Sequence, residues 1–206
     1  EEVKHWHEYV RDENVESSVL NTFFDKIYVI NLKEADAKRK LVEHKLNSLN
    51  IKYTLVEAIL GNDHLDEFEK VKTSQLNLQY PTLQYPGEYG LWLTWKNLFK
   101  EIVDEKIENV LILEDDISFH KDFSKNIVNI LKTLPSKWEV CKFGASDFNF
   151  SENKKTLNNN WYQANLHVCG AFGIGLSKKM IYSIYNKLES HCYTPVDWLY
   201  KESKHI

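Results

Sequence analysis

The sequence predicts an α/β domain with a mixed, mostly parallel central sheet flanked by helices. Two observations predict this fold: short β-branched runs alternate with amphipathic stretches along most of the chain, and one apolar run ends in three consecutive carboxylates. Short apolar runs of this kind indicate buried strands, whereas apolar residues three and four positions apart indicate helices. Their alternation is typical of βαβ units built around a parallel sheet.

The first predicted elements form one such unit. The run KIYVINL at 26–32 predicts a buried strand, and residues 34–49 place Leu41, Val42, Lys45, Leu46 and Leu49 at helical spacing. A second strand, YTLVEAI at 53–59, follows a short connection, and we expect a right-handed crossover. Residues 61–80 are acidic and rich in amides, which predicts a loop with room for one short helix.

The rest of the chain continues the pattern. A loop at 79–90, with two prolines and two glycines, leads into a helix with apolar residues from Leu91 to Ile102. We then expect a strand ending at Leu113, a helix near 122–134, a strand at 138–144, a long polar loop at 145–163, a strand at 171–177, a helix at 178–188 and a turn at 195–198. Residues 1–24 predict a peripheral extension, which leaves residues 25–206 as the domain.

Composition excludes several classes of protein. The net charge is −4 and no block of basic residues occurs, which argues against a nucleic-acid-binding surface. No apolar run approaches the roughly 20 residues that a membrane-spanning helix needs. The three cysteines lack C-x-x-C spacing, which argues against zinc and a disulfide framework. The chain begins at Glu1 and its one methionine is Met180, so we expect a piece of a longer protein. The oligomeric state is left open.

The acidic triplet Glu114, Asp115 and Asp116 is the most informative motif. It directly follows a predicted buried strand, and ligands of such sheets bind beyond the carboxyl ends of the strands. If strand alternation continues through the triplet, Glu114 and Asp116 point the same way and Asp115 points oppositely. Two convergent carboxylates repel each other unless a cation lies between them, and oxygen ligands favour Mg²⁺ or Mn²⁺ over Zn²⁺. A solvated acidic turn is the alternative.

Five segments together resemble glycosyltransferase family 25, which includes lipooligosaccharide glycosyltransferases and collagen hydroxylysine galactosyltransferases. In chain order they are IYVINL at 27–32, GEYGLWLTWKNLF at 87–99, LILEDD at 111–116, GAFGIGLSKK at 170–179 and PVDW at 195–198. The resemblance implies a GT-A-type, Rossmann-like nucleotide-binding domain. It also implies transfer of a hexose from a UDP-sugar to a glycan or protein acceptor, with Mn²⁺ or Mg²⁺ at the triplet.

On this basis we assign the donor side. Asp116 is predicted as the direct metal ligand, and Glu114 as a second ligand that places a metal-bound water or the ribose. Asn31, Leu32 and Arg39 are predicted to cradle the uridine side, together with Asp115. For Arg39 the alternative is an exposed charge on a helix.

Two positions near residue 90 carry open alternatives. Gly87 and Glu88 match a GE pair of the family and precede a helix whose amides face the sugar phosphate, or they simply form its first turn. Thr94 and Trp95 stand where the family usually has Ser-His. Trp95 then either offers its face to a pyranose ring or belongs to the core.

The acceptor side needs a general base, because an inverting transfer removes a proton from the acceptor hydroxyl. Asp197, in the late PVD turn, is the first candidate, with a helix cap as its alternative role, and Asp147 is the second. His191 and His205 are possible further metal ligands. A different class remains open as well: a degenerate, non-catalytic relative that binds a nucleotide or a partner.

Overall fold

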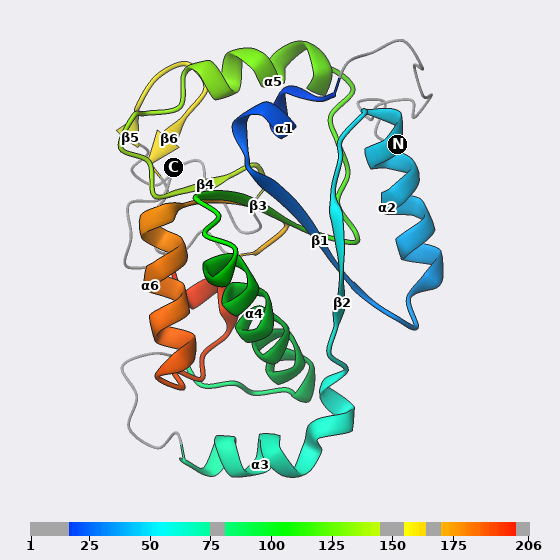
Figure 1. The fold of residues 1–206 in the computed structure, drawn as a ribbon, viewed down its shortest axis with the longest axis vertical. Helices are drawn as coiled ribbons and strands as arrows, with labels where there is room; N and C mark the ends of the chain where they lie inside the picture. Colours follow the sequence, from blue (N-terminus) through cyan, green and yellow to red (C-terminus); the bar gives the residue numbers. More distant parts are fainter. Residues whose placement is uncertain (1–16, 75–80, 145–154, 164–169, 201–206) are drawn as a thin grey trace.

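The computed structural model describes residues 17–74, 81–144, 155–163 and 170–200. A five-stranded sheet of order β2-β1-β3-β7-β4 lies at its centre (Figure 1), formed by β1 (Lys26–Leu32), β2 (Thr54–Ala58), β3 (Asn109–Glu114), β4 (Val140–Lys142) and β7 (Gly173–Ser177). β1 runs parallel to β2 and β3, whereas β7 runs antiparallel to β3 and β4. β7 thus opposes the other strands of this sheet. The predicted mixed sheet is confirmed, but the pairings are not mostly parallel, because two of the four are antiparallel.

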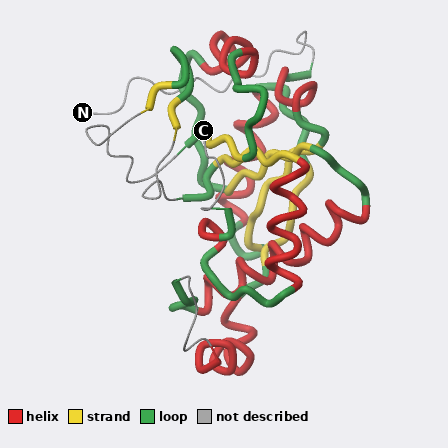
Figure 2. The backbone as a smooth tube through the Cα atoms, turned by 90° about the vertical axis from the view of Figure 1, so that its left-hand side faces the viewer, coloured by secondary structure: helices red, strands yellow, loops and turns green. Residues whose placement is uncertain are grey.

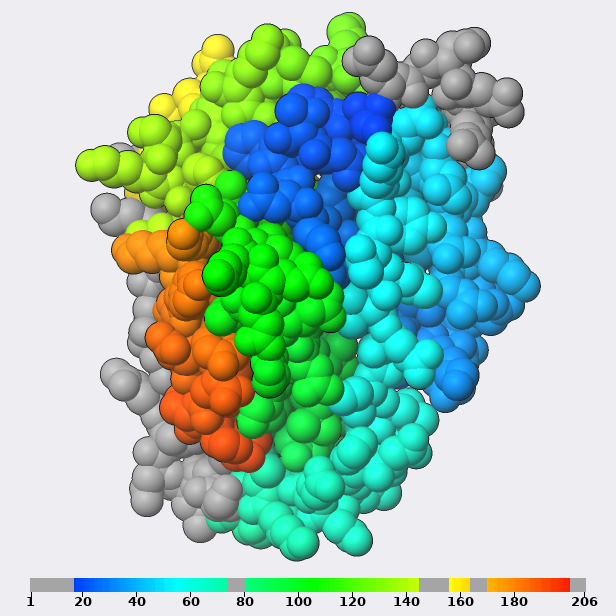
Figure 3. Space-filling model, in the orientation of Figure 1, coloured from blue at the N-terminus to red at the C-terminus, as the bar shows by residue number. Residues whose placement is uncertain are grey.

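Helices cover both faces of the sheet. One face packs against α1 (Val19–Phe23), α2 (Asp36–Ser48) and α5 (Phe123–Lys132), and the other against α4 (Pro86–Asp104) and α6 (Lys178–Glu189). Figure 3 shows α4 and α6 side by side across the front of the molecule. Smaller elements are η1 (Gly61–His64), α3 (Leu65–Ser74), η2 (Val196–Trp198) and the pair β5 (Lys155–Thr156) and β6 (Tyr162–Gln163), which Figure 2 shows apart from the main sheet.

Strand alternation divides the core into two halves. Even-numbered residues of β3, Val110 and Ile112, pack with α4 and α6, whereas Leu111 and Leu113 pack with α2 and α5. β1 follows the same division. The next even position on β3 is Glu114, so the strand delivers this carboxylate to the α4 and α6 side of the sheet.

Three expectations need correction. Residues 65–74 form a ten-residue helix rather than a loop with one short helix, because Phe68 and Val71 are enough to bury one face. The helix expected after residue 90 begins at Pro86, since proline suits the first helical turn and the following residues continue it. Leu41 does not join the apolar face of α2, for it is 51% exposed.

Residues 17–24 pack on the body through α1, where Leu20 and the following Phe24 are buried. Ser18 accepts a hydrogen bond from the Leu20 amide and caps this helix. No helix among the described residues is long and apolar enough to cross a membrane.

The start of α4 lies directly against the chain that leaves β2. A Cβ built on Gly90 would come within 2.4 Å of the Ile59 carbonyl oxygen, and one built on Gly61 within 1.8 Å of the Pro86 carbonyl oxygen. Both obstacles are backbone atoms, which cannot rotate away. Gly87, one turn earlier on α4, has no atom within 4 Å of such a Cβ. The two helical glycines therefore differ in what surrounds them.

We expect Gly90→Ala to destabilise the fold by about 2–4 kcal/mol, because its methyl group would push α4 away from residues 59–61. The control, Gly87→Ala, should be neutral or stabilise by up to about 1 kcal/mol, since alanine is the better helix former. Urea denaturation of the two variants and the wild type measures both. Equal stability of the two variants would contradict the close contact at Gly90.

Candidate functional site

The carboxyl ends of β1 and β3 meet at one edge of the sheet. Ile30 pairs with Glu114 in the parallel register, so Asn31 and Leu32 lie beside the acidic triplet. The buried Asn31 amide donates a hydrogen bond of 2.7 Å from Nδ2 to Oδ2 of Asp115. The structure therefore brings two widely separated predicted segments together.

The strand alternation assumed for the triplet is wrong, because β3 ends at Glu114 and Asp115 and Asp116 form a turn. Glu114 keeps the direction of the even-numbered residues. Asp115 turns toward β1, where Lys38 Nζ lies 3.5 Å from its Oδ1. Asp116 is exposed and lines a cavity on the α5 side of the sheet. The three carboxylates thus leave the strand end in different directions.

The pKa of Glu114 is raised by its burial and by the negative charges around it. Burial, followed by the charges of Asp116, Asp115 and Asp197, raises the pKa of Glu114 to about 7, while Lys38 acts in the opposite direction. Asp197 lies in η2, far along the chain, and still contributes to the electrostatic environment of the triplet. Glu114 therefore interacts electrostatically with three other carboxylates, two of its own triplet and one of η2.

Glu114→Gln should stabilise the cation-free protein at alkaline pH. The folded-state pKa near 7 exceeds the ordinary value of 4.5, so ionising Glu114 destabilises the fold progressively as the pH rises through that interval. The gain should be on the order of 1–3 kcal/mol near pH 8 and should shrink toward zero at about pH 4.

Denaturation of wild type and variant at both pH values measures this difference. Glu105→Gln, at an exposed partner of Lys26, is the control and should show no comparable pH dependence. A gain of the same size at both pH values would show that charge is not its cause.

The predicted cation, Mn²⁺ or Mg²⁺, needs oxygen ligands, which the carboxylates at this edge can supply. Among the described residues no three His, Cys, Asp or Glu side chains form a group that could hold a metal ion. Ions such as Mg²⁺ are nevertheless commonly bound through one or two carboxylates plus substrate phosphates and water. Carboxylates that repel one another at a partly open edge fit an ion shared with a phosphate ligand better than a closed protein cage.

A cavity of about 710 Å³ adjoins the triplet on the α5 side. Its walls are mainly apolar, and polar side chains, including Asp116, Ser118 and Asn126, contribute to its lining. A space of this size with a few polar groups is in the usual range for small-molecule sites.

Other predicted donor residues have different partners. The Arg39 guanidinium pairs with Asp36 one turn earlier in α2, and the Leu32 carbonyl accepts a hydrogen bond from the Ala35 amide. Glu88 accepts from the Gln84 amide at 2.6 Å and from the Tyr85 amide at 3.3 Å, which caps α4. These contacts fit the helix-surface alternative for Arg39 and the helix-start alternative for the GE pair.

Thr94 and Trp95, which stand where the family usually has Ser-His, both contribute to the packing of the fold. Trp95 is buried, with its ring stacked on Phe99 and Tyr200, and thus belongs to the core rather than to a sugar-binding face. The Thr94 hydroxyl accepts from the Ile59 amide and donates to the Gly90 carbonyl, both at 2.8 Å. The Thr94 hydroxyl thus helps to hold α4 against the chain that leaves β2.

The remaining candidates lie apart or outside the described residues. His191 is exposed, with its Nε2 atom 3.3 Å from Lys96 Nζ. Asp147 and His205 lie outside the described residues. Asp197 is not a cap, because Pro195 occupies the cap position of η2.

Sequence reasoning missed two lysines of α2. Lys38 faces Asp115, and Lys45 reaches the segment directly after the triplet. The available signal was the presence of Lys45 in an otherwise apolar helical stripe, which predicts a buried cation in need of a partner.

Comparison with known proteins identifies a family model and several relatives that this chain is similar to. A family model described as glycosyltransferase family 25 (LPS biosynthesis protein) matches residues 24–197. Human procollagen galactosyltransferase 2 is 28% identical over 151 residues, which are 66% of this chain and 23% of the human protein. A glycosyltransferase 25 family member of Drosophila melanogaster is 29% identical over 131 residues, 58% of this chain and 21% of that protein.

A third relative, from Rattus norvegicus, is named probable inactive glycosyltransferase 25 family member 3 and is 24% identical over 140 residues, 63% of this chain and 24% of its own length. The chain therefore spans about a quarter of the length of these relatives. Since the family model matches most of the chain, from the first strand of the sheet to the turn that carries Asp197, the chain belongs to glycosyltransferase family 25.

Proposed function

We propose that this chain forms a GT-A-type domain that transfers a hexose from a UDP-sugar to a hydroxyl group of a protein or glycan acceptor, with Mn²⁺ or Mg²⁺ as cofactor. The observation that carries the proposal is the acidic triplet at the carboxyl edge of the sheet, with Glu114 in electrostatic interaction with Asp115, Asp116 and Asp197. Family membership supports the reaction class. The name procollagen galactosyltransferase, given to human and Xenopus laevis relatives, favours galactose and a collagen-like acceptor.

The charge of the edge explains the need for a cation. A diphosphate and a cluster of carboxylates repel each other, so they come together only with a positive charge between them. When bound, a divalent cation neutralises the charge that develops on the departing UDP. Asp116, the exposed member of the triplet, is proposed as the direct ligand. Glu114, whose charge interacts with that of Asp116, is proposed as a second ligand or as the holder of a metal-bound water.

The residues on β1 and α2 are proposed to hold the nucleotide side. Asn31 fixes Asp115 through its amide, and Lys38 adds a positive charge next to the same carboxylate. The position beyond the end of β1 agrees with the rule that nucleotides bind outside the carboxyl ends of such strands.

Asp197 is proposed as the general base. It removes the proton from the acceptor hydroxyl while that oxygen attacks the anomeric carbon, the bond from the sugar to UDP breaks, and the configuration inverts. η2 is separate from the triplet in sequence, yet Asp197 is near enough to raise the pKa of Glu114. This arrangement leaves Asp197 available to an acceptor that approaches a donor held by the triplet.

A second candidate function is binding of a nucleotide or a partner without transfer. It is favoured by the buried Trp95, which leaves no imidazole at the position of the family's usual histidine. The rat relative whose name marks it as probably inactive belongs to the same family.

Calorimetry with UDP, with and without Mn²⁺, followed by a screen of UDP-sugars for UDP release, tests both candidates. Glycosyl transfer predicts UDP binding that strengthens with Mn²⁺ and hydrolysis of at least one UDP-sugar. Binding without hydrolysis or transfer would favour the non-catalytic candidate. UDP affinity that does not respond to Mn²⁺ or Mg²⁺ would contradict the metal-dependent mechanism.

A further inference from the structure

Lys45 is a buried cation in the apolar face of α2. Val42 and Leu46 of the same helix are fully buried, and Lys45 is 6% exposed. Lysine is rarely buried to this degree unless its charge is paired, because an ammonium group loses its hydration in the interior. An apolar residue would suit the packing of α2 better, so the charge calls for an explanation beyond the core.

The hydrogen bonds that the structure describes for Lys45 go to the segment directly after the triplet. Its Nζ atom donates hydrogen bonds to the Ile117 carbonyl oxygen at 2.6 Å and to the Ser118 hydroxyl at 3.0 Å. Burial lowers the pKa of Lys45, and the negative charge of Asp116 acts in the opposite direction. The ammonium group thus holds the two residues that come directly after Asp116.

We propose that Lys45 is a positioning residue for the cation of the site, a role that rests on the proposed function. By fixing the backbone at Ile117 and the side chain of Ser118, it limits the conformations of the turn and so the direction of the Asp116 carboxylate. It also places a positive charge near the triplet, which offsets the repulsion among the carboxylates. Lys45 itself does not touch donor or acceptor in this proposal.

Lys45→Met tests the proposal, because methionine keeps much of the apolar stem and removes the charge and its hydrogen bonds. With Mn²⁺ present, the UDP affinity should fall by about 10- to 100-fold, the usual effect of removing a group that orients a metal ligand. When a chelator removes the divalent cation, the UDP affinity should stay within about twofold of wild type, since UDP binding without the cation does not depend on the orientation of a metal ligand.

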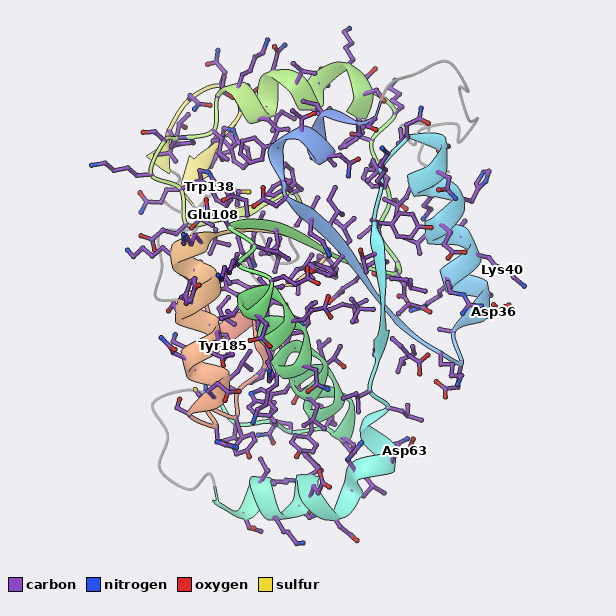
Figure 4. The ribbon with its side chains drawn as sticks, viewed as in Figure 1. Asp36, Lys40, Asp63, Glu108, Trp138 and Tyr185 are labelled. Atoms are coloured by element: carbon purple, nitrogen blue, oxygen red, sulfur yellow. The ribbon has the colours of Figure 1, made fainter. Side chains whose placement is uncertain are left out.

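Lys40→Met on the same helix is the matched control. Lys40 Nζ pairs with Asp36 at 2.6 Å, its side chain is 73% exposed, and Figure 4 shows both residues on the outer side of α2. This variant should bind UDP like the wild type with and without Mn²⁺.

Ser118→Ala keeps the proposal testable if Lys45→Met does not fold. It removes one of the two acceptors at an exposed position and should weaken only the Mn²⁺-dependent part of UDP affinity, by about threefold. The inference would be overturned if these variants had a lower melting temperature but Mn²⁺ still increased their UDP affinity by the same factor as in the wild type. Lys45 would then have only a structural role. A wild-type chain that does not respond to Mn²⁺ would overturn the proposed function as well.

Discussion

Replacing Asp116 with asparagine is expected to remove most of the Mn²⁺-dependent gain in UDP affinity, by about 100-fold or more. An amide keeps the shape of the side chain but not its charge, and a neutral oxygen holds a hard divalent cation poorly. Loss of a direct ligand should exceed the effect of changing a residue that only orients one. Calorimetric titration with UDP, at several Mn²⁺ concentrations, measures the loss.

Asp115→Asn is the matched control within the triplet. Its carboxylate is already engaged by Asn31 and Lys38, so its change should affect Mn²⁺ less than that of Asp116. If Asp115 proves the stronger determinant of Mn²⁺ binding, the cation lies on the β1 side of the turn and the assignment of Asp116 as direct ligand is wrong.

Asp197→Asn is expected to separate binding from chemistry. Turnover should fall by roughly 100-fold or more, the usual loss when a positioned general base is removed, while UDP-sugar affinity changes little. Asp197 contributes to the charge around Glu114 but lies on a different element from the triplet, so its neutral replacement leaves the donor side intact. Steady-state transfer assays and UDP-sugar titration give the two quantities.

Near-normal transfer by Asp197→Asn would exclude it as the base, and Asp147 would then be the residue to replace. Thermal stability provides a separate check. Because Asp197 does not cap η2, its replacement should lower the melting temperature only slightly. A large loss of stability together with full activity would assign Asp197 a structural role.

The central sheet was predictable because its inner strands are buried on both faces. β1 and β3 are continuous apolar runs, a pattern that local sequence alone makes visible. The end of β3 was predictable for the same reason, and the gathering of Asn31 with the triplet followed from parallel pairing.

The direction of each carboxylate was not predictable, since distant contacts determine it. Asn31 and Asp115 are 84 positions apart, and Lys45 and Ile117 are 72 positions apart. No local pattern specifies these hydrogen bonds. Likewise, the helical state of residues 65–74 depends on a few apolar contacts with the rest of the fold and overrides a weakly periodic sequence.

The order of strands has a consequence for synthesis on the ribosome. All the residues of β1, β2 and β3, which pair in parallel, lie within 26–114, whereas β4 pairs with the later strand β7, which lies between β4 and β3. Until residue 177 is available, the backbone groups of β4 lack this partner, and long-range pairing of this kind is slow to form. A nascent chain halted between these strands should therefore be prone to self-association, and Asp197 is synthesised only after β7.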